Sequence, residues 1–250
     1  MEQEKVIQIK ELKVYYKNHR KSPFSKKRKK QVLKGISLDV YEGEILGIAG
    51  ESGCGKSTLA KAIVGMNKDI EGEISVKYTD TQMVFQDPYS SLNPSKKIGW
   101  LLEEPLRVDK EKNWTPKERK DKVLEIMKAI GLPQEMLERY PSQLSGGQRQ
   151  RVSIGVALMR SPKVIIADEP VSALDVTIQA QILQLLRQLH QEYGITILFI
   201  SHDLRVIYQI CDHVAIMKEG TIREYGIPHD VYRNPQSEYT KELLSAAGIR

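Results

Sequence analysis

One short stretch decides the fold of this 250-residue chain. Residues 50–58 read Gly50-Glu51-Ser52-Gly53-Cys54-Gly55-Lys56-Ser57-Thr58. They contain the pattern Gly-x-x-x-x-Gly-Lys-Ser/Thr, in which backbone N–H groups curl around phosphate oxygens. The apolar run at 44–49 predicts a strand before the loop, and the helical spacing of Leu59, Ala62 and Ile63 predicts a helix after it. Strand, loop and helix together predict a nucleotide-binding site at a helix N-terminus.

A second stretch supplies the groups that hydrolysis of a nucleotide needs. Residues 164–167 are apolar and predict a buried strand, which ends in Asp168 and Glu169. Such a strand delivers its last residues to the edge of an α/β sheet where ligands bind. We expect Lys56 to meet the β- and γ-phosphates, Ser57 and Asp168 to hold Mg²⁺, and Glu169 to take the proton of the attacking water.

The remaining pattern predicts an α/β protein. Strands alternate with helices after residue 160, which favours a mainly parallel sheet, while the N-terminal strands favour an antiparallel portion. Between them the region 87–159 is punctuated by proline and its periodic stretches are helical. We therefore predict a P-loop NTPase core formed by 1–86 and 160–250, with an inserted helical sub-domain at 87–159.

Composition excludes a disordered chain and a chain that spans a membrane. Hydrophobic residues make up 40% and charged residues 28% of the chain, which is typical of a folded globular domain. No apolar run approaches the roughly 18 residues that span a bilayer. The first residues lack the pattern of a signal peptide, so we expect a protein of the cytoplasm.

The positive charge is concentrated in one segment. Residues 17–34 carry nine Lys or Arg and no acid; removing these nine from the net charge of +6 leaves the rest of the chain at −3. We interpret this segment as a solvated loop between two strands. The alternative is a contact with nucleic acid, anionic lipid or a protein partner, and a soluble nucleic-acid-associated ATPase would use it as a basic arm.

A third motif indicates which kind of NTPase this is. Residues 144–148 read Leu144-Ser145-Gly146-Gly147-Gln148 and precede a predicted helix. This run offers a second anion-binding surface, which one nucleotide held by the phosphate loop does not need. Two copies packed head to tail would use both surfaces. With these motifs and Asp175 and His202, the chain resembles the ATP-binding cassette (ABC) family over nearly its whole length.

The resemblance implies a role for each matching residue. Gln86 resembles the glutamine that touches Mg²⁺ and links the core to the helical sub-domain. His202 resembles the switch histidine that contacts the γ-phosphate, and Asp175 the acid of the dimer-contact loop. Tyr16 resembles the aromatic residue that stacks on adenine, with Tyr15 as the alternate candidate because alternation in a strand puts one of the pair on the nucleotide side.

Two stretches narrow the resemblance to one branch. Residues 84–94 and the tail 231–244 look like the oligopeptide, dipeptide and nickel importer subfamily, and the chain resembles the second of its two ATPases. The resemblance implies ATP and Mg²⁺ as cofactors. It implies a second, paralogous ATPase, two transmembrane permeases and an extracellular substrate-binding protein as partners, with no nucleic acid. We expect a peripheral protein at the cytoplasmic face of the membrane. The chain ends at Arg250, soon after this tail, and in this it resembles the shorter nickel and metal-chelate members. Peptide and nickel therefore both stay open as substrates.

Two cysteines allow a further expectation. Cys54 lies in the phosphate loop beside Lys56 and a helix start, which predicts a lowered pKa and a reactive thiol that ATP protects. Cys211 lies in an apolar helical stretch, which predicts a buried and slowly reacting thiol.

Overall fold

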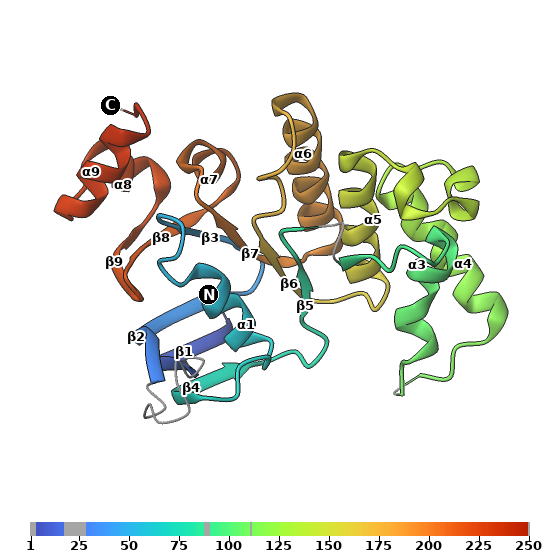
Figure 1. Cartoon of the computed structure of the whole chain (residues 1–250), viewed down its shortest axis with the longest axis horizontal. Coiled ribbons are helices and arrows are strands. Elements are labelled where there is room, and N and C mark those ends of the chain that lie inside the picture. The colour runs from blue at the N-terminus through green and yellow to red at the C-terminus, as the bar shows by residue number, and fades with distance from the viewer. Residues whose placement is uncertain (1–3, 18–28, 88–90, 111, 250) are drawn as a thin grey trace, which may run out of the picture. The chain divides into compact units, whose positions relative to one another are not determined.

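The computed structural model describes residues 4–17, 29–87, 91–110 and 112–249 (Figure 1). It divides into two compact units. Unit 1 comprises Met1–Thr79 and Thr196–Arg250, and unit 2 comprises Asp80–Ile195. The boundaries predicted at 87 and 159 stay a prediction, since this division groups the chain by contacts.

Unit 1 begins with an antiparallel sheet of three strands. The strands are β1 (Lys5–Lys17), β2 (Lys29–Tyr41) and β4 (Ile70–Val76), in the order β2-β1-β4. The alternation of apolar residues in β1 breaks between Ile9 and Leu12, where the register with β2 shifts and Glu11 has a φ of 47°. This bulge returns Leu12 and Val14 to the buried face after Ile7 and Ile9.

A second sheet in unit 1 carries the phosphate loop. The strands of this sheet that belong to unit 1 are β7 (Thr196–Ser201), β3 (Ile45–Ala49), β8 (His213–Lys218) and β9 (Thr221–Gly226), in that order. β3 runs parallel to both β7 and β8, and β9 returns antiparallel to β8. Every residue of β3 and β7 is buried, as expected for central parallel strands covered on both faces.

Helices complete the part of unit 1 that the structure describes. They are α1 (Lys56–Ile63), α7 (Leu204–Ile210), α8 (Pro228–Arg233) and α9 (Glu238–Ala246). α1 and α7 each follow a parallel strand directly, and α8 and α9 form the C-terminal end of the chain (Figure 1).

Unit 2 combines a parallel strand pair with helices. The strands are β5 (Gln82–Val84) and β6 (Val164–Asp168). The helices are α3 (Ile98–Arg107), α4 (Pro116–Ala129), α5 (Gly146–Leu158) and α6 (Val176–Tyr193), with two 3₁₀ turns at Gln134–Glu138 and Pro141–Gln143. Gly155 of α5 lets Leu102, Ile126 and Ile130 approach to within 3.4 Å of the place where a Cβ would stand, so α3 and α4 pack tightly on α5.

The predicted fold class is confirmed, and one expectation needs revision. Residues 18–28 of the basic segment lie outside the described residues. Lys29, Lys30 and Lys34 belong to β2 and not to a loop, and the Lys29 ammonium lies 2.6 Å from the Asp69 carboxylate. Among the helices that the structure describes, none is long and apolar enough to cross a membrane.

Candidate functional site

The phosphate loop lies between β3 and α1, as its sequence predicts. Gly50 has a φ of 151°, and a Cβ on it would stand 2.2 Å from the carbonyl oxygen of Met217 at the end of β8. Gly55 has a φ of 115° and is the N-cap of α1. Only glycine fits the first position without moving backbone, so the loop has its shape before a ligand arrives.

Lys56 is curled over this loop. Its Nζ donates to the carbonyl oxygens of Gly50 at 2.7 Å and Glu51 at 3.0 Å, and the residue is buried. An ammonium group has three N–H donors. Two fix its position, and the third remains to meet a phosphate oxygen.

The pKa of the Cys54 thiol differs from what its neighbours in the sequence suggest. Burial is the largest influence on it and raises the pKa of its thiol, and the nearby Lys56 ammonium offsets this only in part. Its carbonyl oxygen accepts a hydrogen bond from the N–H of Gly220, in the turn after β8. The expectation of a lowered pKa at Cys54 is therefore wrong. Cys211 is half-buried, so the expectation of a fully buried thiol there is wrong too.

His202 and the phosphate loop lie at neighbouring strand ends. In the parallel register of β3 and β7, Ala49 is the partner of Ser201. Gly50 and His202 each come directly after these residues, at the carboxyl edge where such sheets bind ligands. Asp203 is the N-cap of α7 and accepts from the N–H of Arg205 at 2.8 Å, which fixes where the chain turns after His202.

Unit 2 brings Gln86, Asp168 and Glu169 together. β5 and β6 are parallel with Val84 opposite Ala167, so Gln86 and Glu169 emerge at the same edge. Gln86 Nε2 donates to Glu169 Oε2 at 3.0 Å. Glu169 has a φ of 48°, a left-handed conformation that is costly for a side chain larger than glycine or asparagine. Backbone strain of this kind concentrates at functional sites, which supports the role predicted for Glu169.

The residues at 144–148 surround the start of α5. Ser145 is the N-cap: its Oγ accepts from the N–H of Gln148 at 3.3 Å, and the Gln148 side chain accepts from the N–H of Ser145 at 2.9 Å. A Cβ on Gly147 would stand 2.4 Å from Cγ2 of Ile178 in α6, so this glycine permits close packing of two helices. Asp175 is the N-cap of α6 and accepts from the N–H of Ile178 at 3.0 Å. Each of these residues thus has a local structural task, and for Ser145 and Gln148 the Ser-x-x-Gln spacing is itself the sequence signature of a capping box.

Tyr15 and Tyr16 line the same open cavity of about 610 Å³, together with residues 66–69 beyond α1. The Tyr15 hydroxyl donates to Glu71 and the Lys29 ammonium lies 5.8 Å from its ring centroid. Tyr16 accepts a hydrogen bond from Asn67 on its hydroxyl and is 40% exposed. Both rings thus line one cavity, so strand alternation does not separate them, and the adenine contact at Tyr16, with Tyr15 as the alternate candidate, stays a prediction.

The predicted Mg²⁺ ligands fit a hard cation by their chemistry. Ser57 offers a hydroxyl oxygen, Asp168 a carboxylate, and Gln86 an amide oxygen that points away from the carboxylate its nitrogen contacts. Within the described part of the chain no cluster of three or more His, Cys, Asp or Glu could form an all-protein metal site. A Mg²⁺ ion that arrives with phosphate and keeps most of its waters needs only such a sparse set.

Comparison with known proteins agrees with this geometry. Residues 33–172 match the family model described as ABC transporter. The chain belongs to the ABC transporter family. It is 43% identical to the oligopeptide transport ATP-binding protein OppF of Salmonella typhimurium, over 100% of this chain and 80% of that protein. It is 44% identical to the dipeptide transport ATP-binding protein DppF of Haemophilus influenzae, over 94% of this chain and 76% of that protein.

Solved structures of ABC cassettes have the same fold. The dimeric post-hydrolysis structure of the cassette MJ0796 bound to ADP and Pi is 29% identical, with a TM-score of 0.77 over 89% of this chain and 98% of that one. The cassette cbiO1 of Clostridium perfringens is 27% identical, with a TM-score of 0.77 over 98% of this chain and 95% of that one. Family membership confirms the expected P-loop architecture and the expected class of enzyme, an ATPase.

Sequence reasoning missed the residues that support the phosphate loop from outside. Met217, Gly220 and Tyr239 contact Gly50, Cys54 and Glu51 from three elements far along the chain. A Glu-Gly pair at 219–220 between two strands is a turn signal, but nothing in its pattern says which loop the turn contacts.

Proposed function

We propose that this ABC ATPase drives an importer of oligopeptides or dipeptides. The observation that carries this proposal is the identity of 43–44% over at least 94% of the chain to transport ATP-binding proteins of these two kinds. The sequence stretches at 84–94 and 231–244 favour the same branch. A nickel or metal-chelate cargo remains the alternative substrate.

The residues of the site divide the work of hydrolysis. The phosphate loop and Lys56 bind and neutralise the phosphates, and His202 contacts the γ-phosphate. Mg²⁺, held by Ser57, Gln86 and Asp168, would neutralise charge that develops on the phosphate oxygens. Glu169 accepts the proton of the water that attacks phosphorus, so that the P–O bond to the ADP leaving group breaks as the new bond forms.

The remaining residues act in an assembly. Residues 144–148 would complete the nucleotide site of a second, paralogous cassette, with Asp175 in the contact between the two. Two permease subunits and an extracellular binding protein would complete the importer, which places this chain at the cytoplasmic face of the membrane as a peripheral subunit. ATP binding would close the cassettes and hydrolysis would let them part.

Reconstitution tests the proposal. The chain is co-expressed with candidate permeases and a candidate second ATPase from its own source organism, and the purified complex is placed in liposomes with a candidate binding protein. We expect ATP-dependent uptake of labelled peptides, abolished by Glu169→Gln. Uptake of a nickel chelate and not of peptides would overturn the proposal that peptides are the substrate. Salt-sensitive binding to RNA or DNA, with no recovery of membrane partners, would overturn the importer.

A further inference from the structure

The C-terminal helix α9 reaches the phosphate loop through one side chain. The hydroxyl oxygen of Tyr239 accepts a hydrogen bond from the backbone N–H of Glu51, with a nitrogen–oxygen distance of 3.4 Å. The tyrosine comes from the second residue of α9, 188 positions further along the chain. The contact therefore depends on how the C-terminal helices pack on unit 1.

The N–H of Glu51 belongs to the same peptide unit as the carbonyl of Gly50. That carbonyl accepts the shorter of the two hydrogen bonds from Lys56 Nζ, at 2.7 Å. Because a peptide unit is planar and rigid, whatever fixes its N–H also fixes its C=O. Tyr239 and Lys56 thus hold opposite ends of one peptide plane.

The ring of Tyr239 is itself held firmly. Tyr239 is only 6% exposed, the Lys218 ammonium lies 4.2 Å from its ring centroid, and Lys218 also pairs with Glu242 on the next turn of α9 at 3.9 Å. Burial raises the pKa of Tyr239, so the hydroxyl stays neutral at physiological pH. A fixed ring gives the phosphate loop a fixed acceptor.

We propose that Tyr239 is a positioning residue for ATP binding, which acts through the Gly50–Glu51 peptide on Lys56. It fixes the carbonyl that aims the ammonium, so that the third N–H of Lys56 meets the phosphates without first being ordered. Losing the hydroxyl costs nucleotide affinity and leaves the proton transfer at Glu169 untouched. The inference depends on nucleotide binding by the phosphate loop and not on the cargo, so it stands or falls apart from the importer proposal.

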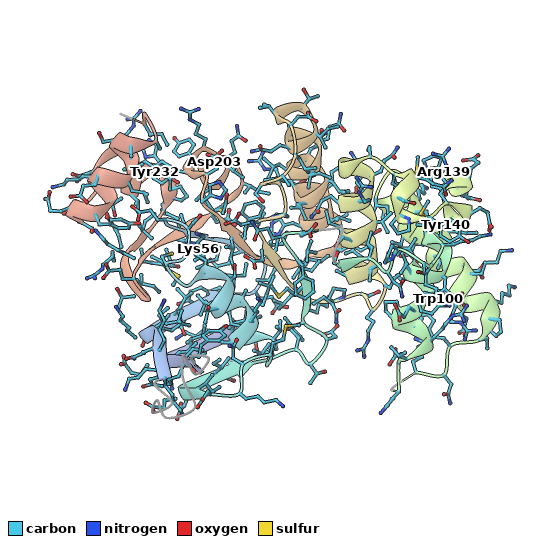
Figure 2. The ribbon with its side chains drawn as sticks, viewed as in Figure 1. Lys56, Trp100, Arg139, Tyr140, Asp203 and Tyr232 are labelled. Carbon is cyan, nitrogen blue, oxygen red and sulfur yellow. The ribbon has the colours of Figure 1, made fainter. Side chains whose placement is uncertain are left out.

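The test compares Tyr239→Phe with Tyr232→Phe. Both substitutions remove one hydroxyl from a buried tyrosine of the C-terminal helices. The Tyr232 hydroxyl donates to the carbonyl of Leu204 at 2.8 Å, and Figure 2 shows Tyr232 among the C-terminal helices, apart from Lys56 at the start of α1. Tyr232→Phe therefore controls for the loss of a buried hydrogen bond as such.

The measurements are the Kd values for AMP-PNP and AMP, together with KM and kcat for ATP. For Tyr239→Phe we expect Kd for AMP-PNP and KM for ATP to rise about two- to tenfold, the range of one hydrogen bond, with kcat unchanged. The Kd for AMP should not move, because AMP lacks the phosphates that Lys56 meets. Tyr232→Phe should change none of these values. Wild-type affinity for AMP-PNP in Tyr239→Phe, an equal loss for AMP, or the same loss in Tyr232→Phe would each overturn the proposal.

Hydrogen exchange reports on the contact directly. In the nucleotide-free protein, the amide of Glu51 should exchange faster in Tyr239→Phe than in wild type, and at the wild-type rate in Tyr232→Phe. If both variants also lose some stability, exchange rises in both, and the lost contact should still make Glu51 exchange faster in Tyr239→Phe than in Tyr232→Phe. Unchanged exchange at Glu51 in Tyr239→Phe would show that the hydroxyl does not hold that peptide.

Discussion

Replacing Glu169 by glutamine separates ATP binding from hydrolysis. The two side chains have the same shape, and the amide oxygen of a glutamine at 169 can keep accepting the hydrogen bond from Gln86 Nε2. What is lost is the carboxylate that accepts the proton of water. A general base contributes about 10²–10⁴-fold to the rate, which corresponds to about 2.7–5.4 kcal/mol in the barrier.

The cost to the fold should be far smaller. A charge-assisted hydrogen bond between Gln86 and Glu169 becomes a neutral one, a difference of about 1 kcal/mol. For a chain of this size that shifts the melting temperature by about 2–4 °C. The variant should therefore stay folded, bind ATP with an affinity within about threefold of wild type, and accumulate as an ATP-bound dimer.

The assay measures phosphate release at saturating Mg-ATP, with size-exclusion chromatography for the dimer. Glu44→Gln is the matched control. Glu44 is also a buried glutamate. Its carboxylate accepts hydrogen bonds from the N–H of Tyr41 and the ring of His213, and it lies immediately before β3, at the end of that strand opposite to the phosphate loop. Turnover within about threefold of wild type in Glu169→Gln, or an equal loss in Glu44→Gln, would refute the role of Glu169 as the base.

Three further predictions concern the phosphate loop and α5. Lys56→Ala should abolish detectable ATP binding in a fluorescent-nucleotide titration, because the phosphates lose their buried cation and the loop carbonyls their donor; retained affinity would contradict this. Ser145→Arg should keep the nucleotide affinity of the monomer but block the dimer that Glu169→Gln traps, whereas Ser145→Ala controls for the lost cap, about 1 kcal/mol. Cys54 should react slowly with maleimide at pH 7 even without nucleotide, and faster as the pH rises, because burial raises the pKa of its thiol and the thiolate is the reactive form. Peptide mass mapping should find Cys211 labelled before Cys54. Fast labelling of Cys54 at pH 7 would contradict the burial of its thiol.

Patterns read along the chain predicted what each local segment does. The phosphate loop, the helix after it and the strand that ends in Asp168 all have signals within about fifteen residues, and each lies where its signal placed it. The sequence also placed Glu169 at the end of a strand. That this strand, β6, is the parallel neighbour of β5, so that Gln86 Nε2 and Glu169 Oε2 lie 3.0 Å apart, is a property of the sheet and of no single stretch.

The errors have one physical origin. For Cys54 the sequence shows the attraction of Lys56 but not the desolvation that outweighs it, since burial depends on elements such as β8 and α9 that arrive late in the chain. The apolar stretch around Cys211 predicts a helix interior, whereas Cys211 is the residue where α7 ends and is only half-buried. In both cases the residues next to the cysteine in the sequence do not predict how far the fold buries it.

The local tasks of Ser145 and Asp175 are compatible with the contacts that we propose for them across a dimer. A hydroxyl has two lone pairs and one donor, and capping α5 uses a lone pair of Ser145 Oγ. A phosphate oxygen needs the donor, which the cap leaves in place while holding the oxygen at the helix N-terminus. Asp175 caps α6 with Oδ1, so its second carboxylate oxygen can accept a further hydrogen bond. Helix capping thus orders the groups that a second nucleotide and a second cassette would meet, and it reduces the entropy lost when they do.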